Sequence, residues 1–140
     1  MNRRPAHPGS PLTPMACSIL IIDDDPFIGE YLRDRLEAMG YHVIVARDGR
    51  TGLALIALEA KQARIRGVLL DLHMPIMDGM QVLQELRAQD RTLPVVVMTA
   101  DPDHRLRERA FALGATHHID KPIDLGEFAE ICDRIFPLSE

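Results

Sequence analysis

The stretch Ser18-Ile-Leu-Ile-Ile-Asp-Asp-Asp-Pro26 joins a short apolar run to a turn and to the start of a helix. β-Branched runs of this length are typical of strands, and Asp followed by Pro is favoured where a helix begins. Helical spacing continues to Met39 and stops at Gly40, a residue suited to a helix C-terminus. One βα unit is therefore predicted, with its helix over Pro26–Met39. The side chains expected on the apolar side of this helix are Phe27, Ile28, Tyr31, Leu32 and Leu36.

The same alternation of short apolar runs and helical stretches continues along the chain. The predicted strands are Ser18–Ile22, Tyr41–Ala46, Gly67–Leu70, Pro94–Met98 and Thr116–Ile119. The last helix is the clearest, with one apolar stripe formed by Phe128, Ile131, Cys132, Ile135 and Phe136. Runs that are apolar at consecutive positions are expected when helices cover both faces of a sheet. We therefore predict an α/β fold, a doubly wound (βα)5 domain whose parallel five-stranded sheet carries helices on both faces.

The composition is typical of a soluble globular domain, with 140 residues of which 46% are hydrophobic and 26% charged. A formal net charge of −5 argues against a general nucleic-acid or acidic-membrane binder, because such surfaces rely on Lys and Arg. No apolar run approaches the ~18 residues of a membrane span, and the start lacks the apolar segment of a signal peptide. Cys17 and Cys132 lie far apart, with no spacing that suggests zinc. We therefore predict a cytoplasmic protein.

The first fifteen residues differ in composition from the rest of the chain. Met1 to Pro14 is rich in proline, a composition that cannot bury enough apolar surface to offset the entropy of ordering. We predict a flexible tail over residues 1–15 and one domain over residues 16–140, with Met15 as an alternative start. Only Pro137–Glu140 follow the last helix, so no effector domain is expected behind it.

Carboxylates stand where predicted strands end, and right-handed crossovers bring all such ends to one edge of a parallel sheet. Asp25 is accounted for as a helix cap, which leaves Asp23 and Asp24. Asp71 could cap a turn, but Asp78 is better placed to begin the next helix. Two carboxylates about 4 Å apart repel by roughly 4 kcal/mol at an effective dielectric of 20. The cluster predicts a cation or a raised pKa, and hard oxygen ligands favour Mg²⁺ or Mn²⁺.

Two further polar residues are expected at the same edge of the sheet. Thr99-Ala100 ends the fourth run, and Lys121-Pro122 follows the fifth. Alone, Thr99 is a strand former and Lys121 a solvated cation. Beside a metal ion and a carboxylate, they would supply the hydroxyl donor and the positive charge that phosphoryl transfer requires. Asp71 is then the candidate nucleophile, since an aspartyl carboxylate can carry a phosphoryl group.

These motifs resemble those of the receiver domains of two-component response regulators, over Ser18 to Phe136. The acidic pair after the first strand is one such motif, and Asp71-Leu-His-Met-Pro75 with Asp78-Gly79 is similar to the phosphoacceptor loop. Thr99-Ala100 and Lys121-Pro122 match the remaining two signatures. The resemblance implies the flavodoxin-like strand order 2-1-3-4-5, a receiver domain over residues 16–140 and a cis peptide bond before Pro122.

The resemblance also implies a role for each residue of the site. The phosphoryl group would be accepted by Asp71 and bound by Thr99, by the main-chain amide of Ala100 and by Lys121. The implied Mg²⁺ ligands are Asp24, Asp71 and the main-chain carbonyl of His73, with Asp23 acting through water.

The implied partner is a phosphodonor, a phosphohistidine on a sensor histidine kinase or on a histidine phosphotransfer protein. The output would be a changed surface on the fourth helix, fifth strand and fifth helix. Arg105, Arg107 and Arg109 lie on a helix of that surface, although a solvated face is the other interpretation of this trio. The resemblance thus implies a signalling domain, not an enzyme, that binds a downstream protein and neither DNA directly nor a membrane.

His118 departs from the family pattern, which usually has Tyr or Phe three residues before the lysine. An imidazole there could hydrogen-bond Thr99 and titrate near neutral pH, so our hypothesis is that phosphorylation coupling is weaker or pH-sensitive. His73 is expected at the mouth of the site, where it either tunes the access of water or is an exposed loop residue. Metal binding by His117 with His118 is disfavoured, because neighbouring strand residues point to opposite faces.

Two other classes of function stay open. Asp23-Asp24-Asp25 contains the D-x-D motif of haloacid-dehalogenase-type phosphatases, but Phe27 stands where that motif usually has Thr, and a later acidic pair is missing. The second alternative is a receiver-like binding module that never uses phosphorylation. The partner affinity of such a module would not change with beryllofluoride, a phosphoryl mimic.

Overall fold

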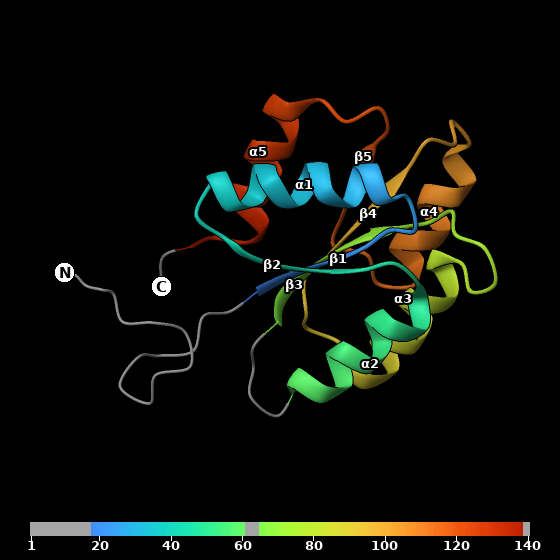
Figure 1. Ribbon diagram of the computed structural model, residues 1–140. Coiled ribbons are helices and arrows are strands. Elements are labelled where there is room, and N and C mark those ends of the chain that lie inside the picture. Colours follow the sequence, from blue (N-terminus) through green and yellow to red (C-terminus); the bar gives the residue numbers. More distant parts are fainter. Residues whose placement is uncertain (1–17, 61–64, 139–140) are drawn as a thin grey trace.

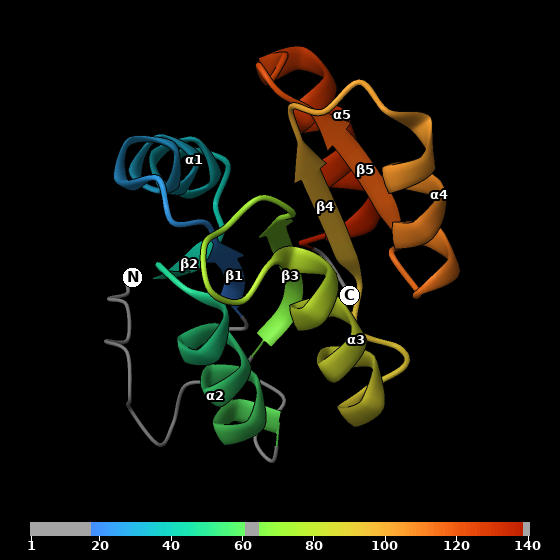
Figure 2. The ribbon, with the colours of Figure 1, turned by 90° about the vertical axis from the view of Figure 1, so that its right-hand side faces the viewer.

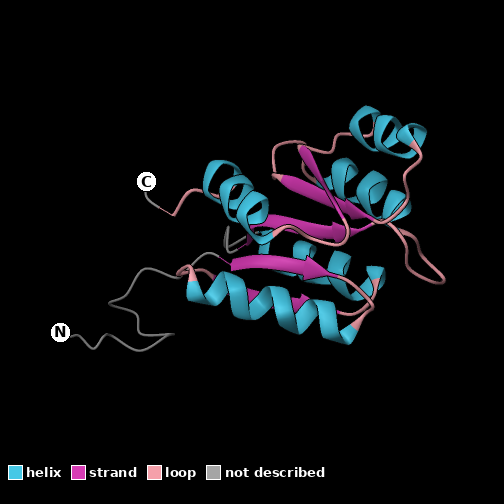
Figure 3. Cartoon of the chain, turned by 90° about the horizontal axis from the view of Figure 1, so that it is seen from above, coloured by secondary structure: helices cyan, strands magenta, loops and turns pink. Residues whose placement is uncertain are grey.

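A five-stranded parallel sheet forms the centre of the molecule in the computed structural model, which describes residues 18–60 and 65–138 (Figure 3). The strands are β1 (Ser18–Ile22), β2 (His42–Ala46), β3 (Ile65–Asp71), β4 (Val95–Thr99) and β5 (His117–Asp120). Their order in the sheet is β2-β1-β3-β4-β5, which confirms the predicted order 2-1-3-4-5. The predicted tail over residues 1–15 and Cys17 lie outside the described residues.

Helices cover both faces of the sheet, as predicted (Figure 1). They are α1 (Pro26–Ala38), α2 (Gly49–Ala60), α3 (Gly79–Gln89), α4 (His104–Ala112) and α5 (Leu125–Ile135). One core cluster joins α1 and α5 to the sheet, and the other joins α2, α3 and α4 to the opposite face. Within residues 18–60 and 65–138, no helix is long and apolar enough to cross a membrane.

The central strand β1 supplies side chains to both cores. Leu20 and Ile22 belong to the cluster under α2 and α3, whereas Ile19 and Ile21 belong to the cluster under α1 and α5. Successive residues of a strand point to opposite faces of the sheet, and helices cover both faces, so all four side chains are fully buried. This double burial explains why the run is apolar at consecutive positions.

The third strand begins at Ile65, two residues before its predicted start. The charged residue Arg66 interrupts the apolar pattern there, and its guanidinium donates a hydrogen bond to the carbonyl of Pro137. A long side chain of this kind can belong to a strand and still reach the surface, so hydrophobic periodicity underestimates the length of the strand. At the next residue, Gly67, a Cβ would lie 2.3 Å from the ring of Phe136. The lack of a side chain at Gly67 therefore leaves room for the ring of Phe136, which follows α5.

The predicted apolar side of helix α1 is confirmed for Ile28, Leu32 and Leu36 and wrong for Phe27 and Tyr31. Leu32 and Leu36 are fully buried, but Phe27 is 85% exposed and Tyr31 is 48% exposed. Phe27 and Tyr31 each lie one position before a residue of the buried stripe, which turns them about 100° around the helix toward solvent. The first turn of α1 thus leaves Phe27 on the surface.

The apolar stripe of α5 is confirmed, and its end is tied to the start of β2 by a tyrosine. Phe128, Cys132 and Phe136 are fully buried. The hydroxyl of Tyr41 lies 2.9 Å from the carbonyl oxygen of Cys132 and 2.6 Å from that of Phe136. Burial raises the pKa of Tyr41 to about 12. The carbonyl of Cys132 also accepts the N–H of Phe136, so the tyrosine chiefly supplies a donor to the carbonyl of Phe136, at the end of the helix.

Replacing Tyr41 with Phe is expected to lower the free energy of unfolding by about 1–3 kcal/mol, because the buried carbonyl of Phe136 would lose its hydroxyl donor. Urea denaturation measures this loss. Tyr31→Phe, which removes a hydroxyl from a half-exposed ring, is the matched control and should change stability by less than about 0.5 kcal/mol. Equal losses in the two variants would contradict a special role for the Tyr41 hydroxyl.

Candidate functional site

The predicted site residues meet at one edge of the sheet. Asp23 follows β1, Asp71 is the last residue of β3, Thr99 is the last residue of β4, and Lys121 follows β5. Parallel pairing of β1 with β3, of β3 with β4 and of β4 with β5 brings these strand ends side by side. The cis peptide bond before Pro122 is present. Four separate βα units thus contribute to one site.

The predicted carboxylate cluster is present. Asp23, Asp24 and Asp71 each offer an oxygen atom, and these atoms lie within 4.8 Å of one another. Asp23 and Asp71 are buried, whereas Asp24 is exposed. The Nζ atom of Lys121 lies 3.2 Å from Asp23 Oδ2 and 3.4 Å from Asp71 Oδ1. One ammonium group therefore faces two buried carboxylates, and the excess negative charge suits a divalent cation.

The protonation of Asp71 reflects its burial. Removal from water raises the pKa of Asp71 to about 6, and the nearby charge of Asp23 also raises it. The main-chain N–H of His73, which lies 3.1 Å from Asp71 Oδ1, and the ammonium of Lys121 act in the opposite direction. The burial of this carboxyl group therefore outweighs the donors around it.

This raised pKa should make stability depend on pH in the absence of metal. Folded Asp71 binds its proton more tightly than the unfolded chain does, so its stabilising contribution is complete below about pH 4 and is lost as the pH rises through about 6. Asp71→Asn is therefore expected to be more stable than the wild type by about 1–3 kcal/mol at about pH 7.5 in EDTA, and by much less at about pH 4. Urea denaturation at both pH values measures the two differences. If they are equal, the carboxyl group does not titrate as its burial indicates.

Thr99 lies at the start of a short chain of hydrogen bonds. Its Oγ1 atom accepts the N–H of Asp101 at 2.9 Å, and Asp101 Oδ1 accepts the N–H of Asp103 at 2.8 Å. Asp103 Oδ1 then accepts the N–H of Arg105 at 2.9 Å, in the first turn of α4. Three bonds that each span two residues therefore connect the end of β4 with the beginning of α4.

The imidazole of His73 contacts the same threonine. Its Nε2 atom lies 2.9 Å from Thr99 Oγ1, a contact that the sequence analysis did not predict. Because β3 and β4 are neighbours and His73 stands two residues past the end of β3, the strand order brings the two residues near each other but does not give the direction of the ring. Thr99 is fully buried, whereas His73 and Ala100 are exposed. The loop after β3 is thereby joined to the end of β4.

His118 lies beside α4, and among the described residues it makes no hydrogen bond to Thr99. The Nε2 atom of His118 is 3.1 Å from Nη1 of Arg107 and 3.7 Å from Oδ1 of Asp120. Its ring meets that of Phe111 edge-on, with centroids 5.9 Å apart. Figure 2 shows α4 and β5 side by side. Of the predicted arginine trio, Arg107 is thus held between the helix and the strand.

The fold and the site together define a class of protein. It is a doubly wound α/β domain with carboxylates, a lysine and a threonine at the carboxyl edge of its sheet. Residues 19–133 match the model of the response regulator receiver domain, and the chain belongs to this family.

Curated relatives and solved structures agree with this assignment. The response regulator MprA of Mycolicibacterium vanbaalenii is 39% identical over 113 residues, which are 81% of this chain and 47% of that protein. The transcriptional regulatory protein QseB of Haemophilus influenzae is 36% identical over 79% of this chain and 48% of its own length. This chain spans about half the length of these relatives.

Two solved receiver-type structures have a similar fold. The chemotaxis protein CheY4 of Vibrio cholerae aligns with a TM-score of 0.77 and 27% identity, over 86% of this chain and 99% of that chain. The receiver domain of NtrX from Brucella abortus aligns with a TM-score of 0.77 and 27% identity, over 87% of this chain and 100% of that chain.

Proposed function

We propose that this chain is a phosphoacceptor of a two-component phosphorelay, in which Asp71 receives a phosphoryl group from a phosphohistidine. The observation that carries the proposal is the position of Asp71: its carboxylate is buried at the strand edge, 3.4 Å from the ammonium of Lys121 and beside two further carboxylates. A nucleophile held next to positive charge, in a receiver-family fold, suits phosphoryl transfer.

The donor set of the site fits Mg²⁺ or Mn²⁺, because it consists of carboxylate oxygens without thiolates. Asp24 and Asp71 would hold the ion directly, together with the main-chain carbonyl of His73, and Asp23 would act through water. A bound ion would offset the charge of the carboxylates and of the phosphoryl oxygens.

The transfer step needs little covalent machinery from the protein. A carboxylate oxygen of Asp71 attacks the phosphorus atom, and the N–P bond of phosphohistidine breaks as the O–P bond forms. The imidazole leaves with the electron pair of the broken bond. Lys121 pairs with the phosphoryl oxygens, and the hydroxyl of Thr99 and the main-chain N–H of Ala100 donate to them.

The proposed role is signalling within a receiver domain over residues 16–140. The phosphodonor would be a sensor histidine kinase or a histidine phosphotransfer protein, and the output would be protein binding by the face of α4, β5 and α5. We propose no direct DNA contact by the receiver domain, although QseB is named a transcriptional regulatory protein. Membership of the receiver family argues against the haloacid-dehalogenase alternative.

The test is incubation with acetyl phosphate and Mg²⁺, followed by intact mass measurement. A gain of one phosphoryl group that requires the divalent cation supports the proposal, and the absence of any gain with and without a histidine-kinase donor refutes it. Partner affinity measured with and without beryllofluoride then separates a phosphorylation switch from a module that ignores phosphorylation.

A further inference from the structure

The hydroxyl of Thr99 has only one proton to donate, and its environment shows which group receives it. Thr99 Oγ1 accepts the N–H of Asp101, and the other hydrogen-bond partner recorded for it among the described residues is Nε2 of His73 at 2.9 Å. A fully buried hydroxyl that kept its proton unpaired would carry a desolvation cost. The favourable arrangement therefore has His73 Nε2 as the acceptor, with the proton of the neutral imidazole on Nδ1.

The main chain of His73 is also bonded to the phosphoacceptor. Its N–H lies 3.1 Å from Asp71 Oδ1, while its ring reaches Thr99 on the neighbouring strand. One residue of the β3–α3 loop thus bridges the carboxylate and the hydroxyl of the proposed site. A Thr99 hydroxyl that donates its proton to a group on Asp71 can no longer donate it to the ring.

We propose that His73 is a positioning residue that holds the Thr99 hydroxyl while Asp71 is unphosphorylated and competes with phosphoryl oxygens for its single proton. The proposal rests on the proposed phosphoacceptor function. A phosphoryl oxygen on Asp71 and the imidazole cannot both receive that proton. His73 therefore lowers the affinity of the site for a phosphoryl group and opposes the switched state.

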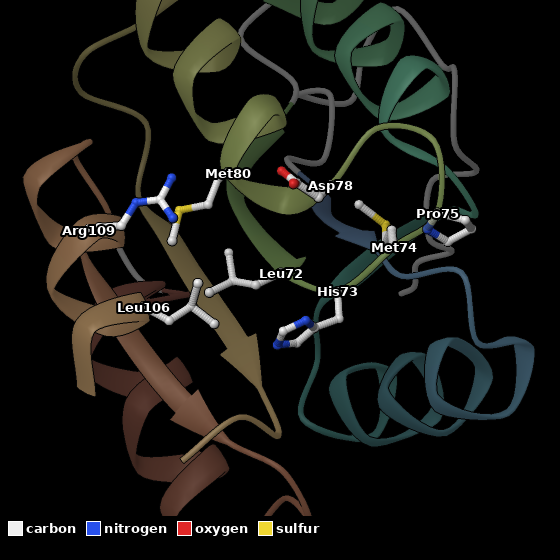
Figure 4. Close-up of a pocket in the computed structure, with 8 residues that line it drawn as sticks. All are labelled: Leu72, His73, Met74, Pro75, Asp78, Met80, Leu106 and Arg109. Atoms are coloured by element: carbon white, nitrogen blue, oxygen red, sulfur yellow. The ribbon is translucent and has the colours of Figure 1, made fainter. Parts of the chain in front are cut away.

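A cavity beside the ring gives the imidazole room to move when it is released. His73 lines a cavity of about 460 Å³ between the β3–α3 loop, α3 and α4. Figure 4 shows the His73 ring at this cavity, whose apolar wall includes Leu72, Met80 and Leu106. Because His73 is already exposed, its ring can leave Thr99 without disturbing the packed core.

The affinity for beryllofluoride in the presence of Mg²⁺ tests the competition, with titration followed by ¹⁹F NMR. His73→Phe keeps a ring but offers no acceptor, so it is expected to bind beryllofluoride about fivefold more tightly than the wild type, as one hydrogen bond of about 1 kcal/mol implies. His73→Gln keeps a polar acceptor at a similar reach and should stay close to the wild type. In a Thr99→Ala background, His73→Phe should produce no gain.

The free protein supplies a second readout that a merely structural role would not affect. Nitrogen-15 NMR of the imidazole should show protonated Nδ1 and unprotonated Nε2 in the wild type, and this signature should be lost in Thr99→Ala. A protonated Nε2, or an unchanged spectrum in Thr99→Ala, would overturn the assignment.

Failure of this inference is distinguishable from failure of the proposed function. If acetyl phosphate modifies Asp71 but His73→Phe binds beryllofluoride no more tightly than the wild type, the positioning role alone is wrong. If no phosphoryl group is accepted, the phosphoacceptor function is wrong, and the competition for the Thr99 proton is refuted with it.

Discussion

Asp71→Asn is expected to abolish phosphoryl incorporation from acetyl phosphate, from about one group per chain to none, because the amide cannot act as the nucleophile. The replacement is nearly isosteric, and its carbonyl oxygen can still accept the N–H of His73. The fold should therefore persist, with the higher stability at neutral pH that the burial of Asp71 implies. Intact mass spectrometry reports the modification, and urea denaturation verifies the fold.

Asp25→Asn is the matched control for this experiment. Asp25 lies two residues from Asp23, but its carboxylate caps α1 by accepting the N–H groups of Phe27 and Ile28, a role that Asn also fills. The control should gain a full phosphoryl group. A mass gain that survives in Asp71→Asn and disappears in Asp23→Asn would place the nucleophile after β1 instead.

Gly79→Ala is expected to destabilise the protein by about 2–4 kcal/mol, although alanine is the better helix former. A Cβ at Gly79 would lie 2.4 Å from the carbonyl oxygen of Asp71 and 2.6 Å from the Cα atom of Leu72. Both neighbours are backbone atoms, so neither can rotate away. The strand end that carries Asp71, the proposed phosphoacceptor, would have to shift, and phosphorylation by acetyl phosphate should slow as well.

Gly126→Ala separates this steric effect from helix propensity. Gly126 lies in the first turn of α5, and among the described residues an added Cβ would come close to one atom, the Asp124 carboxylate oxygen at 3.3 Å. Its stability should change by less than about 1 kcal/mol. Thermal and urea unfolding measure both variants. If Gly79→Ala were as mild as this control, α3 would not pack on the backbone of β3 as closely as the structure indicates.

The strands and the carboxylate cluster could be predicted because they depend on features that the sequence displays directly, whereas the strand order was implied by the resemblance to receiver domains. Apolar runs buried on both faces mark β1 and β4, and the carboxylates stand next to strand ends. The start of β3 was missed because Arg66 breaks the apolar pattern while its side chain reaches out of the sheet. The exposure of Phe27 was missed because its spacing to Tyr31 fits an apolar side of a helix. Which side of α1 faces the sheet depends on how the whole helix packs.

The contact between His73 and Thr99 could not be predicted, for a different reason. Adjacent strand ends bring the two residues near each other, but the direction of the ring depends on the backbone of the β3–α3 loop. That loop includes Ile76, a non-glycine residue with a φ of 69°, a conformation that residue spacing does not reveal. The direction of a side chain in an irregular loop is therefore the part of the site that the sequence does not predict.

The hydrogen bonds from Thr99 to Arg105 order the segment before α4. In each bond a main-chain N–H donates to the side chain two residues earlier. Asp101 and Asp103 thereby restrain the backbone between the end of β4 and the first turn of α4. Asp101→Ala or Asp103→Ala would each remove one of these bonds and loosen the start of α4, while leaving the three carboxylates of the cluster in place.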